Sequence, residues 1–130
     1  MSLLGLDIGI TGCKAVVFDE EGNVLSHVYC EYSLLHPKPR WTELNPDFLW
    51  GKVKEVVFKA ATQARSDPIR ALSISTQGET MVPVSKDDKP LYNFIITFDN
   101  RTEPQFQRWQ EEIGKEEIFQ ITGIASTSDV

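Results

Sequence analysis

The first third of the chain alternates short apolar runs with tight polar turns. Residues 3–8 and 13–18 are almost wholly apolar, and residues 24–33 alternate more loosely between apolar and polar positions. Turns at 9–12 and 19–23 separate the three runs, and glycine-containing turns of this kind favour hairpins. Because short connections join antiparallel neighbours, the pattern predicts a three-stranded antiparallel meander.

A helix with a well-marked start is predicted next. The connection at 36–39 holds two prolines and must run extended. Asn45 is a typical N-cap residue, Pro46 suits the first helical position, and apolar residues then recur at helical spacing as far as residue 64. The following apolar run, 69–74, predicts a strand. A crossover through the helix returns this strand most economically to the same sheet.

The second half of the chain is predicted to add two strands and two helices. Residues 81–84 and 94–98 have strand patterns, although Pro83 confines the first of them to an edge or a bulge. Two helical patterns, separated by Gly114, follow from Thr102 onward.

The order of these elements defines the fold class and the domain organisation. It indicates an α/β layer fold with a mixed sheet, an N-terminal three-stranded meander and flanking helices. At 130 residues, the chain is one domain or part of one. We expect one incomplete domain over residues 1–123 and an unpatterned tail at 124–130.

Composition and charge exclude several classes of protein. Hydrophobic residues make up 41% of the chain and charged residues 25%, which is ordinary for a globular domain and excludes a disordered one. A formal net charge of -6 argues against nucleic acid and anionic membranes as partners. No apolar run approaches the roughly 20 residues of a membrane helix, and the N-terminus has no signal-peptide pattern. We therefore expect a cytoplasmic protein.

The most informative chemical feature is the turn after the first predicted strand. Asp7 is a carboxylate in an otherwise apolar run, so it must be paired, solvated or bound to a cation. Gly9 and Gly12 flank a turn whose main-chain amides can point outward together and bind phosphate oxygens. Thr11 adds a hydroxyl and Lys14 a positive charge, and Mg²⁺ could bridge the carboxylate and the anion. A plain hairpin with a strand-end aspartate is an equal alternative.

Polar groups also follow two later apolar runs. Gln77, Gly78 and Glu79 lie just past a predicted strand, where ligands gather in α/β sheets. The amide and the carboxylate could hydrogen-bond the hydroxyls of a polyol, and a solvated polar turn is the alternative. Asp99 and Arg101 could bind a substrate or simply pair and cap the next helix. The residue types favour the structural role for this pair.

Taken together, these segments resemble the FGGY carbohydrate kinase family, which includes xylulokinase, gluconokinase and glycerol kinase. The motifs that carry the resemblance are Asp7-Ile8-Gly9-Ile10-Thr11-Gly12 with Lys14, Trp41-Thr42-Glu43, Gln77-Gly78-Glu79-Thr80 and Asp99-Asn100-Arg101. The resemblance extends to about Gly123. It implies an actin-like ATPase fold, in which two ribonuclease H-like domains close over a cleft, with ATP, Mg²⁺ and a sugar or polyol as ligands.

The resemblance also implies roles for individual residues. Asp7 would take the metal-facing position. The expected contacts of the nucleotide phosphates are Thr11, Gly12, Cys13 and Lys14. The expected substrate contacts are Gln77, Gly78, Glu79 and Asp99. The family's general base lies beyond Val130, so we expect the chain to need the remainder of the kinase as its partner and to have no kinase activity alone.

Two departures from the family and two alternative functions stay open. The family usually has Thr or Ser where Ile10 stands and often Ser at Gly12, and glycerol kinases carry Arg where Gly78 stands. Another actin-like ATPase would share the fold without the sugar pocket. A complete, non-catalytic binding module would expose no apolar face. Part of a larger enzyme should instead expose an apolar seam and self-associate, so a homo-oligomer is one expectation.

Overall fold

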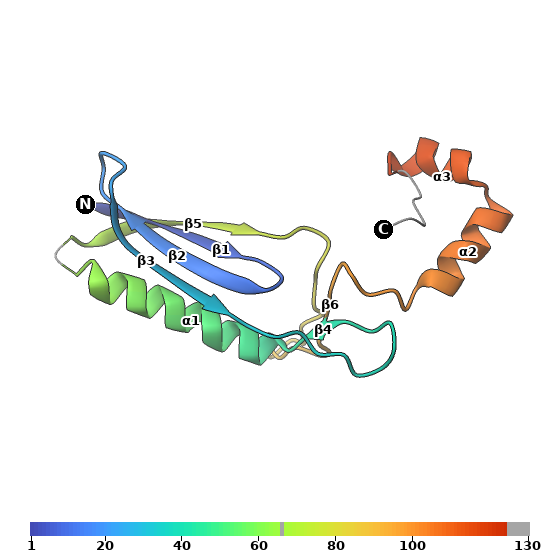
Figure 1. Cartoon of the computed structure of the whole chain (residues 1–130), viewed down its shortest axis with the longest axis horizontal. Coiled ribbons are helices and arrows are strands. Elements are labelled where there is room, and N and C mark those ends of the chain that lie inside the picture. The colour runs from blue at the N-terminus through green and yellow to red at the C-terminus, as the bar shows by residue number, and fades with distance from the viewer. Residues whose placement is uncertain (66, 125–130) are drawn as a thin grey trace.

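The computed structural model describes residues 1–65 and 67–124, and its largest element is a four-stranded sheet. In the order β3-β2-β1-β5, the strands are β3 (Val24–Glu31), β2 (Gly12–Phe18), β1 (Ser2–Ile8) and β5 (Ile69–Thr76) (Figure 1). The first three pair antiparallel, which confirms the predicted meander. β5 pairs parallel with β1 after a crossover through α1 (Pro46–Gln63), as the sequence predicts.

The helix α1 begins where its sequence signals place it and covers one face of the sheet (Figure 1). Asn45 Oδ1 accepts a hydrogen bond of 2.9 Å from Phe48 N, and Pro46 occupies the first turn. Buried Ser26 donates its hydroxyl to Ala60 O at 2.8 Å, so the polar group between sheet and helix is satisfied. The core includes Leu4, Leu6, Cys13, Ala15 and Val17 from the sheet and Val53, Val56 and Ala60 from the helix.

No described helix covers the other face of the sheet (Figure 1). Alternation along β2 directs Cys13 and Ala15 toward α1 and Lys14 to the opposite, exposed face. β5 is almost wholly exposed. Its apolar side chains Leu72 and Ile74 pair in register with the buried Leu4 and Leu6, so they point to the same side of the sheet as α1, but they lie open to solvent. These side chains form an apolar surface of the kind expected of part of a larger enzyme.

A second, two-stranded sheet lies beside the first and is not predicted by the sequence pattern. β4 (Glu43–Leu44) pairs antiparallel with β6 (Phe94–Ile95). The strand predicted at 94–98 is therefore confirmed in place but is only two residues long. Two-residue strands have no periodicity of their own, so only the pairing of distant segments defines them.

The prediction of a strand at 81–84 is wrong. Among the described residues, only an isolated bridge between Val84 and Pro90 forms in this region. Pro83 accepts a hydrogen bond from Leu91 N at 2.9 Å but has no N–H to donate in return, which interrupts a ladder at this point.

Two short helices end the described part of the chain. α2 (Glu103–Glu112) and α3 (Lys115–Thr122) lie where the helical patterns predict them. Between them Gly114 has a φ of 94°, a conformation that favours glycine and breaks the helix. Neither helix buries a residue, and both lie away from the four-stranded sheet (Figure 1). The predicted tail at 124–130 lies outside the described residues except for Ile124.

None of the described helices combines the length and the apolar character that crossing a bilayer requires.

Candidate phosphate and substrate site

The turn between β1 and β2 leaves main-chain donors open. Gly9 N donates to Gly12 O at 2.9 Å and closes the turn. Tyr32 N donates to Thr11 O at 2.9 Å, and the Tyr32 hydroxyl donates to Gly9 O. Within residues 1–65 and 67–124, the amides of Ile10 and Thr11 donate to no protein acceptor. The carbonyls are thus bonded inward, while two N–H donors are available for an anion.

Tyr32, the residue directly after β3, fixes this turn by its two hydrogen bonds. Its ring is buried, and burial raises the pKa of the phenol above its ordinary value. The phenol therefore stays protonated and keeps its hydrogen bond to the Gly9 carbonyl across the physiological pH range.

Asp7 and Lys14 lie opposite each other on the uncovered face of the sheet. They are register partners across β1 and β2, and both are exposed. In the described part of the chain, neither side chain takes part in an ion pair. Together with Ser73 and Ser75 of β5, they border an open hollow of ≈ 260 Å³. The ammonium suits an anion at the open amides, and the carboxylate suits a divalent cation.

A metal ion at Asp7 would take most of its ligands from outside the protein. Among the described residues, no group of three or more His, Cys, Asp and Glu side chains could hold a metal ion. Mg²⁺ is usually bound through one or two carboxylates together with phosphate oxygens and waters. A single open carboxylate beside a phosphate-binding turn fits that mode.

Cys13 differs from the other expected phosphate contacts. Its side chain is buried on the face covered by α1, and desolvation raises the pKa of the thiol. Gly12 has no side chain. Any contact of Gly12 or Cys13 with an anion is therefore limited to main-chain groups. Thr11 and Lys14 are the two expected contacts whose side chains are exposed.

The segment after β5 leaves the sheet beside this turn. β1 and β5 are parallel neighbours, and Gln77 N donates to Ile8 O at 3.4 Å. Gly9, Gln77 and Thr80 help to line a hollow of ≈ 160 Å³. Gln77 Oε1 and Thr80 Oγ1 are buried there without a hydrogen-bond partner among the described residues. Because buried polar atoms are nearly always paired, the hollow can accept a hydroxyl-bearing ligand or a water molecule.

Gly78 and Glu79 form the exposed part of the same segment. Glu79 has a φ of 54°, which is uncommon for a residue other than glycine. Such conformations cost free energy and cluster at ligand-binding sites. The turn at 9–12 follows β1 and the segment 77–80 follows β5. Because these two strands are parallel neighbours, the sheet brings the turn and the segment together at one end of the sheet.

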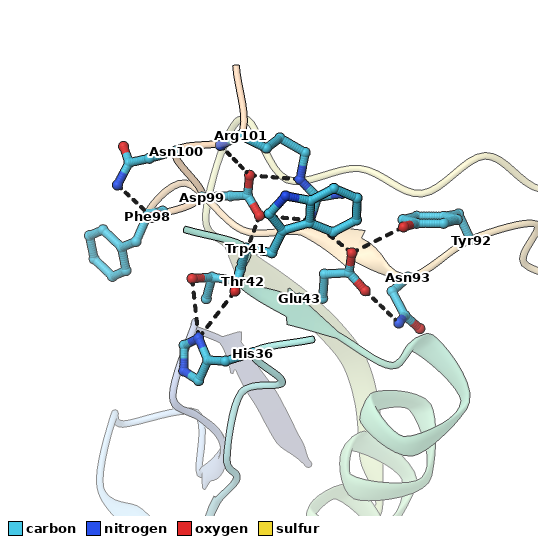
Figure 2. Close-up of polar contacts among 10 residues, drawn as sticks. All are labelled: His36, Trp41, Thr42, Glu43, Tyr92, Asn93, Phe98, Asp99, Asn100 and Arg101. Carbon is cyan, nitrogen blue, oxygen red and sulfur yellow. Dashed lines mark hydrogen bonds and ion pairs between the residues drawn. The ribbon is translucent and has the colours of Figure 1, made fainter. Parts of the chain in front are cut away.

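Asp99 belongs instead to a buried ion-pair network (Figure 2). Arg101 Nε and Nη2 each donate to its carboxylate at 2.7 Å. Thr42 N and Arg101 N donate to the same group at 2.6 and 2.9 Å. The Arg101 guanidinium lowers the pKa of the Asp99 carboxyl to about 2. A substrate hydroxyl would have to displace one of these four donors. The geometry therefore favours the structural role of Asp99, in which it pairs with Arg101.

Glu43 is the member of this network to which the sequence analysis gives no role. Its Oε1 accepts from Arg101 Nη2 at 2.7 Å and from the Tyr92 hydroxyl at 3.1 Å. Its Oε2 accepts from Asn93 Nδ2 at 2.8 Å (Figure 2). The hydrogen bond from Asn93, followed by that from Arg101, lowers the pKa of the carboxyl. The one signal in the sequence is the place of Glu43 in a motif that carries the family resemblance.

The Trp41 ring covers the other side of the guanidinium. Arg101 Cζ lies 3.8 Å from the ring centroid, within the range of a cation–π interaction. The network therefore links β4 and the two residues before it to residues on both sides of β6, from Tyr92 to Arg101.

Comparison with known proteins identifies the family. The N-terminal domain of the FGGY family of carbohydrate kinases matches residues 2–128, and the chain belongs to this family. It is 36% identical over 126 residues to a glycerol kinase of Leifsonia xyli subsp. xyli. It is 38% identical over 125 residues to glycerol kinase 2 of Thermotoga maritima. Both alignments cover 94% of this chain and 25% of the relative, so the chain spans about a quarter of these curated relatives.

Solved structures share the fold. A gluconate kinase from Lactobacillus acidophilus superposes with a TM-score of 0.84 at 27% identity, over 95% of this chain and 25% of that structure. The Plasmodium falciparum glycerol kinase with ADP gives a TM-score of 0.87 over 97% of this chain and 26% of its own. At 22% identity, the latter likeness concerns the fold alone. The predicted family and the predicted actin-like ATPase fold are both confirmed.

Proposed function

We propose that the chain is the N-terminal part of an ATP-dependent carbohydrate kinase, which transfers the γ-phosphoryl group of ATP to a hydroxyl of a sugar or polyol. The observation that carries the proposal is the turn after β1, where the open amides of Ile10 and Thr11 lie next to the exposed Asp7 and Lys14. Membership of the family supports the reaction class. The enzyme would act in the cytoplasm, where ATP is available.

The turn would hold the phosphate end of Mg·ATP. The two open amides and the Lys14 ammonium would bind phosphate oxygens, and the Asp7 carboxylate would face Mg²⁺. Thr11 would add its exposed hydroxyl, while Gly12 and Cys13 would contribute main-chain groups. When bound, the metal neutralises phosphate charge and the nucleotide supplies the transferred group. The ADP in the Plasmodium falciparum glycerol kinase supports nucleotide binding by this fold.

The segment after β5 would bind the substrate. Gln77 has a buried, unpaired oxygen, Gly78 leaves open space beside it, and Glu79 adds an exposed carboxylate. These groups suit hydroxyls, and they lie at the same sheet edge as the turn. Asp99 is a secondary candidate, because its carboxylate is already bonded to protein donors. Sugars and polyols such as gluconate, xylulose and glycerol are the compounds to test.

The reaction would need the remainder of the kinase. Phosphoryl transfer depends on positioning and charge stabilisation from both sides of a closing cleft. The chain spans about a quarter of its curated relatives. The exposed Leu72 and Ile74 of β5 support packing against further protein, whereas a complete binding module would have no such surface. We therefore expect no phosphorylation by residues 1–130 alone.

A chimera tests this proposal. The chain replaces the matching quarter of Thermotoga maritima glycerol kinase 2, and ATP-dependent phosphorylation of glycerol, gluconate and xylulose is measured. The chimera should phosphorylate at least one of these compounds, and the isolated chain none. Asp7→Asn and Lys14→Met should each reduce the rate by roughly a hundredfold, as expected when one stabilising group is lost from a phosphoryl-transfer site.

Matched variants on another exposed turn control for the change in charge. Asp87→Asn and Lys86→Met remove the same two charges far along the chain and should leave the rate unchanged. The proposal fails if a folded chimera that binds Mg·ATP phosphorylates none of the compounds. It fails equally if the Asp7 and Lys14 variants are as active as these controls.

A further inference from the structure

Tyr29 of β3 lies on the uncovered face of the sheet, beside the turn at residues 9–12, here called the phosphate turn. Its register partner is Lys14, whose own partner on the next strand is Asp7. The three side chains therefore form one row across β3, β2 and β1. The Tyr29 ring leans over Gly12: a β-carbon at position 12 would lie 2.6 Å from ring atoms Cε2 and Cζ and would also collide with the hydroxyl.

Gly12 is thus the residue that makes room for the phenol. Contacts of 2.6 Å between carbon atoms are shorter than any that side chains tolerate, so even an alanine would push the ring aside. The position of the Tyr29 ring therefore depends on residue 12 having no side chain. The phenol lies where the side chain of residue 12 would otherwise be.

The hydroxyl of Tyr29 has no protein partner in the described part of the chain, and the residue is 51% exposed. Tyr32, three residues further along, differs from Tyr29. Its ring is buried, and its hydroxyl donates a hydrogen bond to the Gly9 carbonyl. Tyr32 therefore stabilises the turn through its carbonyl groups. Tyr29 presents an O–H donor next to Gly12, at the end of the turn that has the open amides.

We propose that the Tyr29 hydroxyl is a further phosphate ligand, which donates a hydrogen bond to a nucleotide phosphate held by the turn. The inference rests on the proposed function of the same turn. A phenolic O–H is a donor that an anionic oxygen readily accepts, and hydrogen bonds to charged groups are stronger than neutral ones. The purely structural alternative is that the ring only packs on Gly12 and its hydroxyl contacts water.

Removal of the hydroxyl alone separates the two roles. The dissociation constant of Mg·ATP is measured by calorimetry for the chimera with Thermotoga maritima glycerol kinase 2, which supplies the other side of the cleft, and for its Tyr29→Phe variant. The variant should bind about tenfold more weakly, which is the loss expected for one hydrogen bond to a charged group, with an unchanged melting temperature. Tyr92→Phe, which removes a phenolic hydroxyl from the Glu43 network, is the matched control and should bind like the unmodified chimera.

The outcomes distinguish this inference from the proposed function. If the unmodified chimera binds Mg·ATP, Asp7→Asn and Lys14→Met weaken binding and Tyr29→Phe does not, the inference is overturned and the proposed function stands. If a folded chimera binds no Mg·ATP, the phosphate role of the turn and that of Tyr29 are both overturned.

A second pair of variants tests the exchange of space between positions 12 and 29. Gly12→Ala should weaken binding of Mg·ATP about tenfold in the presence of Tyr29, because its β-carbon displaces the phenol and supplies no hydroxyl in return. In a Tyr29→Ala background, the same substitution should change binding little, because no phenol remains to be displaced. Equal losses in both backgrounds would overturn the inference.

Discussion

Arg101→Met should destabilise the chain by about 3 kcal/mol, because it leaves two buried carboxylates without their shared cation. The guanidinium bonds Asp99 twice and Glu43 once, each at 2.7 Å. Methionine keeps an unbranched apolar side chain but lacks the guanidinium, whose Cζ lies 3.8 Å from the Trp41 ring centroid. The substitution therefore removes the charge, the hydrogen bonds and the cation–π contact with Trp41.

The magnitude follows from burial and from the donors that remain. The Asp99 and Glu43 side chains are only 1% and 4% exposed, so water cannot replace the lost cation. Removing one partner of a buried ion pair costs about 3–5 kcal/mol. Each carboxylate keeps two hydrogen bonds from other donors, which favours the lower end of that range.

Urea unfolding at neutral pH, followed by tryptophan fluorescence, measures the change. Arg108→Met is the matched control, since Arg108 pairs with Glu112 on the helix surface and the two side chains are 71% and 59% exposed. It should cost less than about 1 kcal/mol. Arg101→Lys keeps the charge but loses the planar fork, and its loss should fall between the two.

The dependence on pH is a further check on the cause. Without the guanidinium, the two carboxyl groups should ionise at higher pH, so protonation relieves their burial cost. The difference between Arg101→Met and the unmodified chain should therefore shrink as the pH falls below the ordinary carboxyl range. A loss at neutral pH no larger than that of Arg108→Met would refute the reasoning. So would a penalty that stays constant in acid.

Three further outcomes are expected. The folded pKa values of Glu43 and Asp99 are lowered, so the stability they contribute is present above their ordinary values of 4.5 and 3.8 and is lost as the pH falls toward about 2. Urea midpoints should fall over that window, and less steeply for Asp99→Asn. Tyr32→Phe should cost about 1 kcal/mol in thermal unfolding, because the bonded carbonyl of the turn loses its donor. Leu72→Ser with Ile74→Ser should reduce self-association in sedimentation velocity and change stability by less than about 0.5 kcal/mol, since both side chains are exposed.

Local signals account for the part of the fold that the sequence predicts. Asn45 and Pro46 mark the start of α1, and the turns at 9–12 and 19–23 define the meander, because each acts through neighbours a few residues away. β4 and β6 lie about fifty residues apart and are two residues long, so no window of sequence contains their pairing.

The network around Glu43 cannot be predicted from local sequence for the same reason. Its partners Tyr92, Asn93 and Arg101 lie 49 to 58 positions away. A lone glutamate before a helix resembles a solvated charge, and only its burial reveals that it must be paired. Asp99 differs, because three of its four hydrogen bonds come from Arg101, two residues away, and the residue types already favour that pairing. Only the bond from Thr42 N, 57 residues away, is beyond a local reading.

Some features of the phosphate site can likewise be predicted from local sequence, and one cannot. Asp7 and Lys14 are joined by one hairpin, and strand alternation alone puts Lys14 and Cys13 on opposite faces. Tyr29 depends on a subtler feature. Counting back from the pair Phe18 and Val24 beside the turn would set Val28 opposite Lys14, but a bulge skips Leu25 and advances the register by one residue.

Since the side chains of a strand alternate with a period of two, that single skipped residue exchanges the faces of everything beyond it. It turns Val28 toward α1 and brings Tyr29 to the open face beside the turn. A bulge of this kind is fixed by how β2 and β3 pack together, so the pattern of β3 alone cannot reveal it. The proposed phosphate ligand is therefore a product of register, and the residue type by itself gives no indication of it.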